Sequence, residues 1–367
     1  MNRIVLIETI FPDYRMGLFV RLKETHGEQL LLVCGKDSFS ATLQTASTAG
    51  RITKIIRNSF LLGRRLLWQA GLNKIGRDVD LVIIEFNLRA PSTWWLLWRR
   101  HRAGRPTVFW GHASGSRSIS APIRRWMLRR AAGFIAYMPA EQRRLQAEFL
   151  RLPVWVAPNA MMWARDCRFL TRPATEVVDV IYVGRIVAKK KVGLLLTGFA
   201  EATNKGLLPA RSRLLLIGDG PERAALHARA LALGLGERVV FPGRVADVAQ
   251  LREWYAGALV AVSPGYVGLS VTQALSFGVP MLIADHEPHS PEIELCEAGR
   301  NAVFFRSDDP ADLARALGEF TSDCATWVAR REEISRDVRE HYSFDAMAAT
   351  FEQVIATYVT NLPKTHS

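Results

Sequence analysis

The sequence contains only four cysteines among 367 residues, and no two of them form a C-x-x-C pair. We therefore expect reduced thiols and neither a metal site nor a disulfide framework. Long apolar runs are also missing, since no window holds the roughly 18 apolar residues that a membrane-spanning helix needs. The first apolar run covers residues 4–7 and ends at Glu8, which is too short for the core of a signal peptide. These absences predict a cytoplasmic protein.

Acidic residues are scarce in residues 1–165, which hold 10 Asp and Glu against 26 Lys and Arg. The remaining residues hold 25 and 22, so the net charge of +13 comes from the N-terminal part, which also has eight of the ten tryptophans. Three interpretations stay open. The basic part binds an anionic membrane surface through Arg and Trp, binds a nucleic acid, or is a solvated surface with no partner.

Short apolar runs alternate with helical patterns along the whole chain. This alternation predicts an α/β fold with parallel sheets that carry helices on both faces. A polar stretch near residues 165–177 separates two such sets, so we expect two doubly wound, Rossmann-like domains at 1–165 and 177–340, followed by a C-terminal helix and tail at 341–367. The predicted strands are 3–7, 29–33, 81–84, 107–110, 133–137, 154–157, 178–183, 213–217, 239–241, 259–262, 280–283 and 301–305.

Two loops of the second predicted domain combine glycine with groups that bind anions. The first follows the strand 178–183 as Gly184-Arg185 and continues to Lys190. Ligands of doubly wound sheets bind beyond the carboxyl ends of the strands. There Arg185 offers a planar fork and Lys190 a point charge, which suits a diphosphate. A basic surface loop is the alternative.

The second loop follows the strand 259–262 and leads into a helix that starts near Ser270. Its glycines permit close approach of the backbone, and its N–H groups with the helix N-terminus form an anion site. Gln273, about one turn into the helix, is able to hydrogen-bond a ribose hydroxyl. The donor-binding residues predicted in this loop and helix are Gly265, Gly268, Leu269, Ser270 and Gln273.

The order and spacing of these segments resemble the donor half of retaining glycosyltransferases of family 4, which have the GT-B fold. The turn Gly218-Asp219-Gly220 fits that pattern, whereas a dinucleotide fingerprint would need glycine in place of Arg223. The resemblance covers residues 178–320 well and residues 1–165 more weakly. It implies two Rossmann-like domains facing across a cleft, sugar transfer with retention from a nucleoside-diphosphate sugar, and no metal or other cofactor. It places the donor diphosphate on Arg185 and Lys190.

The sequence departs from that family at the paired glutamates of the motif E-x(7)-E. Gln273 aligns with the second glutamate and retains hydrogen bonding to the ribose. Gly265 aligns with the first, which lies near the donor sugar in the family, and this replacement removes a carboxylate. Candidates to replace that carboxylate follow in the next loop and are Glu287, Glu292 and Glu294.

The resemblance also implies roles for residues of the N-terminal part. His112 follows a strand and a glycine, where it contacts the donor sugar or assists proton transfer; a capping role is the alternative. Glu85 ends a strand and is an acceptor contact or general base, unless it forms a salt bridge to Arg89. In the loop after the first strand, Gly17 is expected near the diphosphate and Arg15 near an acceptor phosphate.

The implied acceptor is a saccharide or lipid-linked saccharide on the way to a surface polysaccharide, such as lipopolysaccharide or O-antigen. For a lipid-linked acceptor, the basic and aromatic segments 94–100 and 124–130 suit peripheral association with the inner face of the cytoplasmic membrane, although packing of their tryptophans into the core is equally open. We expect no nucleic-acid partner, because no nucleic-acid-binding motif is present. The first rival function is a catalytically silent sugar- or lipid-binding partner protein, suggested by Gly265 and Gln273, and the second, less favoured, is a basic nucleic-acid-binding protein.

Overall fold

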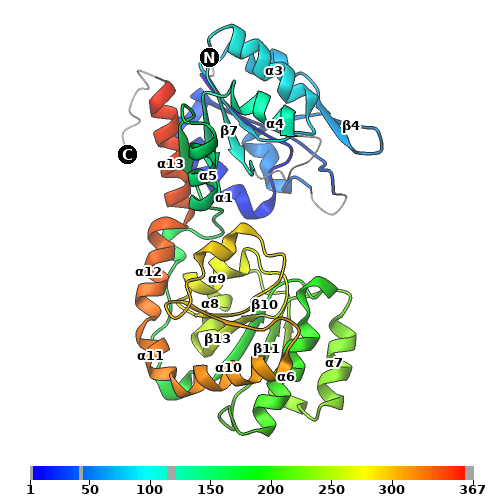
Figure 1. Ribbon diagram of the computed structural model, residues 1–367, viewed down its shortest axis with the longest axis vertical. Coiled ribbons are helices and arrows are strands. Elements are labelled where there is room, and N and C mark those ends of the chain that lie inside the picture. Colours follow the sequence, from blue (N-terminus) through cyan, green and yellow to red (C-terminus); the bar gives the residue numbers. More distant parts are fainter. Residues whose placement is uncertain (1–2, 41–43, 114–120, 360–367) are drawn as a thin grey trace. The chain divides into compact units, whose positions relative to one another are not determined.

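The computed structural model describes residues 3–40, 44–113 and 121–359. The chain divides into two compact units, and each has its own sheet (Figure 1). The first unit runs to Met161 and also takes in the chain from Phe344 onward, while the second runs from Met162 to Ser343.

Among the described residues, the first unit contains a parallel sheet of seven strands. Every residue of its strand β1 is buried, as expected of a parallel strand that is covered on both faces. In order across the sheet, the strands are β3 (Thr53–Ile56), β2 (Leu30–Gly35), β1 (Ile4–Glu8), β6 (Leu81–Glu85), β7 (Thr107–Gly111), β8 (Gly133–Ala136) and β9 (Val154–Val156). A separate antiparallel hairpin consists of β4 (Asn58–Leu61) and β5 (Leu66–Gln69).

The last helix of the chain belongs to the first unit. This helix, α13, packs against α1, and a Cβ atom added at Gly17 of α1 would lie 2.4 Å from the ring of Phe344. Thr350 Oγ1 also donates to the carbonyl oxygen of Val156 at 3.0 Å. The helices of this unit are α1 (Met16–His26), α2 (Leu72–Gly76), α3 (Pro91–Arg102), α4 (Ala121–Leu128), α5 (Pro139–Glu148) and α13 (Phe344–Tyr358).

The second unit contains a parallel sheet of six strands within the described part of the chain. In order across the sheet, they are β12 (Val239–Gly243), β11 (Leu214–Ile217), β10 (Asp179–Val183), β13 (Ala258–Ser263), β14 (Met281–Ala284) and β15 (Ala302–Phe305). Its helices are α6 (Val192–Asn204), α7 (Arg223–Ala232), α8 (Val248–Ala256), α9 (Ser270–Ser276), α10 (Pro310–Ser322), α11 (Cys324–Ala329) and α12 (Arg331–His341).

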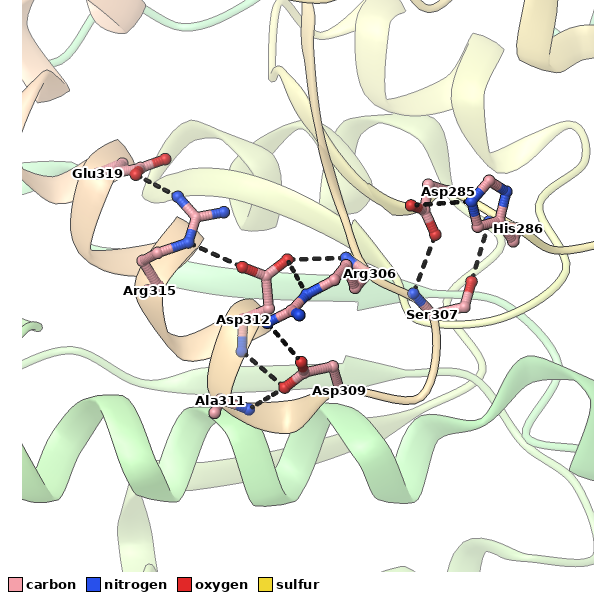
Figure 2. Close-up of polar contacts among 9 residues, drawn as sticks. All are labelled: Asp285, His286, Arg306, Ser307, Asp309, Ala311, Asp312, Arg315 and Glu319. Carbon is pink, nitrogen blue, oxygen red and sulfur yellow. Dashed lines mark hydrogen bonds and ion pairs between the residues drawn. The ribbon is translucent and has the colours of Figure 1, made fainter.

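A polar network fixes the loop between β15 and α10 (Figure 2). Asp309 caps α10 by accepting hydrogen bonds from the backbone N–H groups of Ala311 and Asp312 at 3.0 and 2.9 Å. The Asp312 carboxylate in turn accepts from the N–H of Arg306 at 2.8 Å. A hydrogen bond from Arg315 holds the pKa of Asp312 below its usual value. Because both ends of the loop are held, Asp308 within it has a defined position.

The predicted α/β fold with two Rossmann-like domains is confirmed, and all twelve predicted strands are present with ends that differ by one or two residues. Two features were missed. Strand β3 is a half-exposed edge strand, and the hairpin β4–β5 lies outside the main sheet, so neither has the continuous apolar run of a buried parallel strand. The helix predicted within residues 341–367 is α13 (Phe344–Tyr358), and residues 360–367 lie outside the described residues. In the described ranges, no helix combines the length and apolarity needed to cross a bilayer.

The packing of α13 predicts that Phe351→Ala destabilises the first unit. The Phe351 side chain is fully buried, and its ring lies edge-on to Trp110 with centroids 4.8 Å apart. Removing a buried aromatic ring leaves a cavity and lowers the free energy of unfolding by about 3–5 kcal/mol. Chemical denaturation would measure this change. The exposed neighbour Gln353 is the control, and equal effects of Phe351→Ala and Gln353→Ala would contradict the packing described here.

Candidate functional site

The loop that follows β10 packs backbone to backbone against the turn that follows β11. The N–H of Ile186 donates to the carbonyl oxygen of Asp219 at 2.8 Å. Cβ atoms added at Gly218 and Gly220 would lie 1.8 and 2.1 Å from the carbonyl oxygens of Gly184 and Ile186, and both glycines have positive φ. Only glycine fits at these two positions, so the turn and the loop hold each other at the carboxyl edge of the sheet.

The glycine loop that follows β13 packs against the same segment. The N–H of Tyr266 donates to the carbonyl oxygen of Lys189 at 3.0 Å, and Lys190 Nζ donates to the carbonyl oxygen of Tyr266 at 2.7 Å. A Cβ atom added at Gly265 would lie 2.6 Å from the carbonyl oxygen of Lys189. The structure therefore brings the predicted residues Lys190 and Gly265 together, because β10 and β13 are neighbours in the sheet.

Three basic residues, Arg185, Lys189 and Lys190, lie close together at this edge of the second sheet. Burial and, to a smaller extent, the nearby cations Lys189 and Arg185 lower the pKa of Lys190 to about 8. The Lys190 amino group donates to a carbonyl oxygen rather than to a carboxylate, whereas Lys191 is paired with Glu287 at 2.5 Å and Asp308 at 2.8 Å. An anion placed here would stabilise the charged form of Lys190.

The remaining predicted donor residues lie where the glycine loop becomes α9. The helix begins at Ser270, its N-cap residue is Leu269, and no side chain caps it. The first turn is formed, since the N–H of Gln273 donates to the carbonyl oxygen of Leu269 at 3.1 Å. A Cβ atom added at Gly268 would be in ordinary contact with Ser290 Oγ at 3.4 Å. Thus Gly268 has room that Gly265 lacks.

The three candidate carboxylates of the next loop have different surroundings. Glu287 is paired with Lys191, and Glu294 is exposed. Glu292 is buried and accepts a hydrogen bond from Ser290 Oγ. Since Ser290 lies next to Gly268, Glu292 is the carboxylate that is linked to the glycine loop by the shortest chain of contacts.

In the first unit, Arg15 is enclosed by protein groups. Its guanidinium donates to Glu8 at 3.1 Å, to the Tyr137 hydroxyl at 2.5 Å and to Asn159 Oδ1 at 3.2 Å. It also lies 4.9 Å from the centroid of the Trp110 ring. Its side chain is only 13% exposed, so the geometry fits a positioning role at least as well as contact with an acceptor phosphate. The predicted phosphate contact stays a prediction.

Glu85 and Arg89 do not form the salt bridge that was one of the two sequence interpretations. Glu85 Oε2 accepts the N–H of Thr9 at 2.8 Å. The Arg89 guanidinium donates instead to the carbonyl oxygens of Arg64 and Arg65, at 2.5 and 2.9 Å. Glu85 thus joins the ends of β6 and β1, and its role toward an acceptor remains a prediction.

His112 lies one residue beyond β7, with a side chain that is 43% exposed. Its Nδ1 is 3.8 Å from Glu141 Oε2, and its ring packs edge-on to Tyr137 at 4.4 Å. Glu141 is itself held by the N–H of Ala113 at 2.7 Å. The imidazole is therefore oriented by a fixed carboxylate and retains an accessible face, as a hydrogen-bonding or proton-transferring group requires.

The sequence analysis missed three residues of this cluster, namely Glu8, Tyr137 and Glu141. Glu8 is 2% exposed, and burial raises its pKa to about 8 against the opposing effect of Arg15. Glu8 and Tyr137 stand at or directly after the ends of β1 and β8. The strand-end rule that selected Glu85 and His112 could have found both, whereas Glu141 on α5 had no comparable signal.

Packing against the ring of Phe344 explains the contacts of the predicted site residue Gly17. Its proximity to a diphosphate stays a prediction. Over the described ranges, the structure has no cluster of three or more His, Cys, Asp or Glu residues arranged to hold a metal ion, and the metal requirement of the protein also stays a prediction.

Comparisons with known proteins show the fold and a family to which the second unit is similar. Residues 178–323 match the model of the family described as Glycosyl transferases group 1. Over its whole length, the chain is similar to HepE of Anabaena solved with UDP, with a TM-score of 0.69, 18% identity, and 97% and 100% of the two chains covered. It is also similar to the lipopolysaccharide outer core galactosyltransferase WaaB, with a TM-score of 0.67, 14% identity, and 97% and 99% covered.

Curated relatives are similar over a shorter range. The chain is 25% identical over 181 residues to a lipopolysaccharide core biosynthesis mannosyltransferase of Rhizobium leguminosarum bv. viciae. The aligned region covers 47% of this chain and 48% of the relative. The chain is 28% identical over 184 residues to D-inositol 3-phosphate glycosyltransferase of Streptomyces scabiei, covering 47% and 40%. The matched region thus spans about half the length of these relatives, or less.

The protein therefore has the GT-B fold of the solved glycosyltransferases. Its segment 178–323 matches the glycosyltransferase group 1 model, which agrees with the predicted glycosyltransferase class, and the solved structures confirm the predicted fold. Retention of configuration and a role in surface polysaccharide synthesis remain predictions.

The buried Glu8 predicts a characteristic dependence of stability on pH. Its pKa in the folded protein, about 8, lies above the ordinary value of 4.5. The folded state therefore retains a proton that the unfolded state releases, and the free energy of unfolding falls as pH rises from about 4.5 to about 8. In Glu8→Gln this fall should be smaller, as denaturation at several pH values would show. Glu28→Gln, at an exposed glutamate, should behave as wild type; identical pH profiles for Glu8→Gln and wild type would refute the prediction.

The two glycines of the β13–α9 loop should differ in their tolerance of a methyl group. Gly265→Ala forces the loop away from Lys189, and such overpacking lowers the free energy of unfolding by about 1–3 kcal/mol. Gly268→Ala is the matched control and should change it by less than about 0.5 kcal/mol. Unfolding experiments on both variants test this contrast, and an innocuous Gly265→Ala would show that the two loops are not in the contact described.

Proposed function

We propose that the protein transfers a sugar from a nucleoside-diphosphate sugar to a saccharide or lipid-linked acceptor. One observation carries the proposal: two loops meet at the carboxyl edge of the second sheet, where Lys190 contacts the glycine loop and Arg185 lies close enough to affect its charge. The contact lies inside the segment that matches the group 1 family. Cations and exposed backbone at this edge suit a diphosphate.

The chemistry needs stabilisation of a leaving diphosphate. The bond between the anomeric carbon and the phosphate oxygen breaks, and negative charge grows on the diphosphate. Arg185, Lys190 and the N–H groups at the start of α9 would neutralise that charge, the kind of electrostatic effect that contributes most to many enzymatic rates. The proposal involves no metal ion.

We favour a front-face route with retention of configuration. The acceptor oxygen bonds to the anomeric carbon on the face that the diphosphate leaves, and its proton passes to a diphosphate oxygen. Support for this route is that Gly265 carries no side chain and Glu292 is buried beneath Ser290, so neither offers a nucleophilic carboxylate at the glycine loop.

Residues of the first unit are proposed as acceptor-side groups. His112, Glu85 and Arg15 cluster with Glu8 and Tyr137 near the carboxyl ends of strands, the edge at which such sheets bind ligands. His112 is the most exposed of them with an oriented ring, so we assign it a hydrogen bond to a sugar hydroxyl or a proton transfer.

A surface polysaccharide is the proposed destination of the sugar. Support comes from the names of two similar proteins, a core mannosyltransferase and an outer core galactosyltransferase, both of lipopolysaccharide. UDP is the first nucleotide to test, because the similar HepE structure was solved with it.

A catalytically silent sugar-binding protein is the second candidate, and one observation favours it. The loop contact at Lys189 leaves no space for a glutamate at position 265, so the carboxylate that the related family carries there is absent. Nucleotide binding without any transfer or hydrolysis of a donor would favour this candidate.

The proposal predicts that one nucleotide among UDP, GDP, ADP and dTDP raises the melting temperature of the purified protein. Stabilisation reaches about 2.7 kcal/mol when the nucleotide is at a hundredfold excess over its dissociation constant. The shift should be lost in Arg185→Ala and Lys190→Ala, should persist in EDTA, and should weaken above about pH 8 as Lys190 loses its proton.

Lys205→Ala is the control variant, since Lys205 directly follows α6, is exposed and is paired with Glu201 of that helix. It should retain the full shift. A shift that survives both Arg185→Ala and Lys190→Ala would place the nucleotide elsewhere, and the absence of a shift with all four nucleotides would remove the basis of the proposed function.

A further inference from the structure

The hairpin β4–β5 presents an apolar face to solvent. It projects from the main body of the first unit (Figure 1). In its register, Leu61 pairs with Leu66 and Ser59 with Trp68, and these pairs share one face because alternate residues of a strand do so. The opposite face is buried through Leu67 and Gln69. On the outward face and at the tip, Leu61 is 48%, Leu62 73% and Trp68 41% exposed.

Helix α3 lies beside the hairpin and also has an exposed aromatic side chain. The N–H of Gln69 on β5 donates to Ser92 Oγ of α3 at 3.1 Å, and Trp95, one turn along the helix, is 46% exposed. The Trp95 ring stacks on that of Trp98 at 5.0 Å. By contrast, Trp94 and the α4 residue Trp126 pack against the core. We call the outward residues Leu61, Leu62, Trp68 and Trp95, with the exposed cations Arg57 and Arg65, the hairpin–α3 surface.

The same part of the chain lacks acidic residues. Residues 38–77 and 86–140 contain no Asp or Glu, although they contain seventeen Lys and Arg. The exposed large apolar side chains are concentrated here as well: of the eight found in the described residues, five lie between residues 55 and 95. Positive charge and apolar exposure therefore coincide on one region.

The positive charge and the exposed apolar side chains together indicate which kind of partner binds this surface. Trp and Arg next to exposed leucines match an anionic bilayer, whose headgroups attract cations and whose interface accommodates indole rings. A nucleic acid would use the cations but offers little to Leu61 and Leu62 at the tip. A second copy of this chain, paired by two-fold symmetry, would bring Arg57 and Arg65 of both copies close together, and these like charges repel.

We propose that the hairpin–α3 surface docks on an anionic phospholipid bilayer. Leu61 and Leu62 enter the headgroup region, Trp68 and Trp95 lie at the interface, and Arg57 and Arg65 contact lipid phosphates. This docking is independent of the proposed sugar transfer, because it involves none of the residues assigned to the donor or the acceptor.

Vesicle co-sedimentation of the full chain tests the docking. The protein should bind vesicles of phosphatidylcholine mixed with phosphatidylglycerol and not vesicles of phosphatidylcholine alone, and salt should weaken the binding. The double variant Arg57→Gln/Arg65→Gln should bind about thirtyfold more weakly, as expected for two cations near the surface. Leu61→Ser/Leu62→Ser should also lose binding.

Matched controls are Leu150→Ser, at a leucine that is 90% exposed, and Arg211→Gln, at an exposed arginine of the second unit; both should bind as wild type. Circular dichroism would check that each variant is folded. If Leu61→Ser/Leu62→Ser does not fold, Arg57→Gln/Arg65→Gln still tests the proposal. Three results would overturn the proposal. The first is no binding to anionic vesicles, and the second is an equal loss of vesicle binding in the variants and the controls. The third is self-association or oligonucleotide binding through this surface that anionic vesicles do not displace.

Discussion

The candidate donor site depends on close contact between backbones where glycine replaces any side chain. The carbonyl oxygens of Gly184 and Ile186 occupy the space that side chains at Gly218 and Gly220 would need, and the carbonyl oxygen of Lys189 does so at Gly265. These contacts hold the loops after β10, β11 and β13 together at one edge of the sheet. With the loops fixed, the Lys190 amino group reaches the carbonyl oxygen of Tyr266.

That constraint also explains the departure from the paired-glutamate motif. A carboxylate at position 265 would have to displace the backbone of Lys189, so glycine is a requirement of the packing in this protein. The remaining carboxylates are used locally: Glu287 neutralises Lys191, and Glu292 accepts from Ser290. In the proposed function, the departing diphosphate would neutralise the positive charge of Lys190 and Arg185.

In the first unit, ionisable groups are buried at the carboxyl edge of a mostly apolar sheet. Arg15 gathers Glu8, Tyr137 and Asn159 around one guanidinium, and burial raises the pKa of Glu8. The hairpin–α3 surface of the same unit has the opposite character, with exposed cations and aromatic rings in segments that contain no Asp or Glu. The basic residues of the first unit thus have two environments: Arg15 is enclosed in a cluster of polar groups, and others are exposed on the hairpin–α3 surface.

The sequence by itself determined the two α/β sets, the strand ends and the residues at those ends, because buried parallel strands require continuous apolar runs and their carboxyl ends gather ligand-binding groups. Arg185 and Lys190 were predicted in this way, and the family resemblance added the prediction of His112. Tertiary structure alone decided that α13 packs on the first unit, that Gly17 contacts Phe344, that Glu141 orients His112, and that Trp95 faces outward while Trp94 packs inward. These are contacts between residues distant in sequence or choices between faces of one helix, and local patterns carry no information on either.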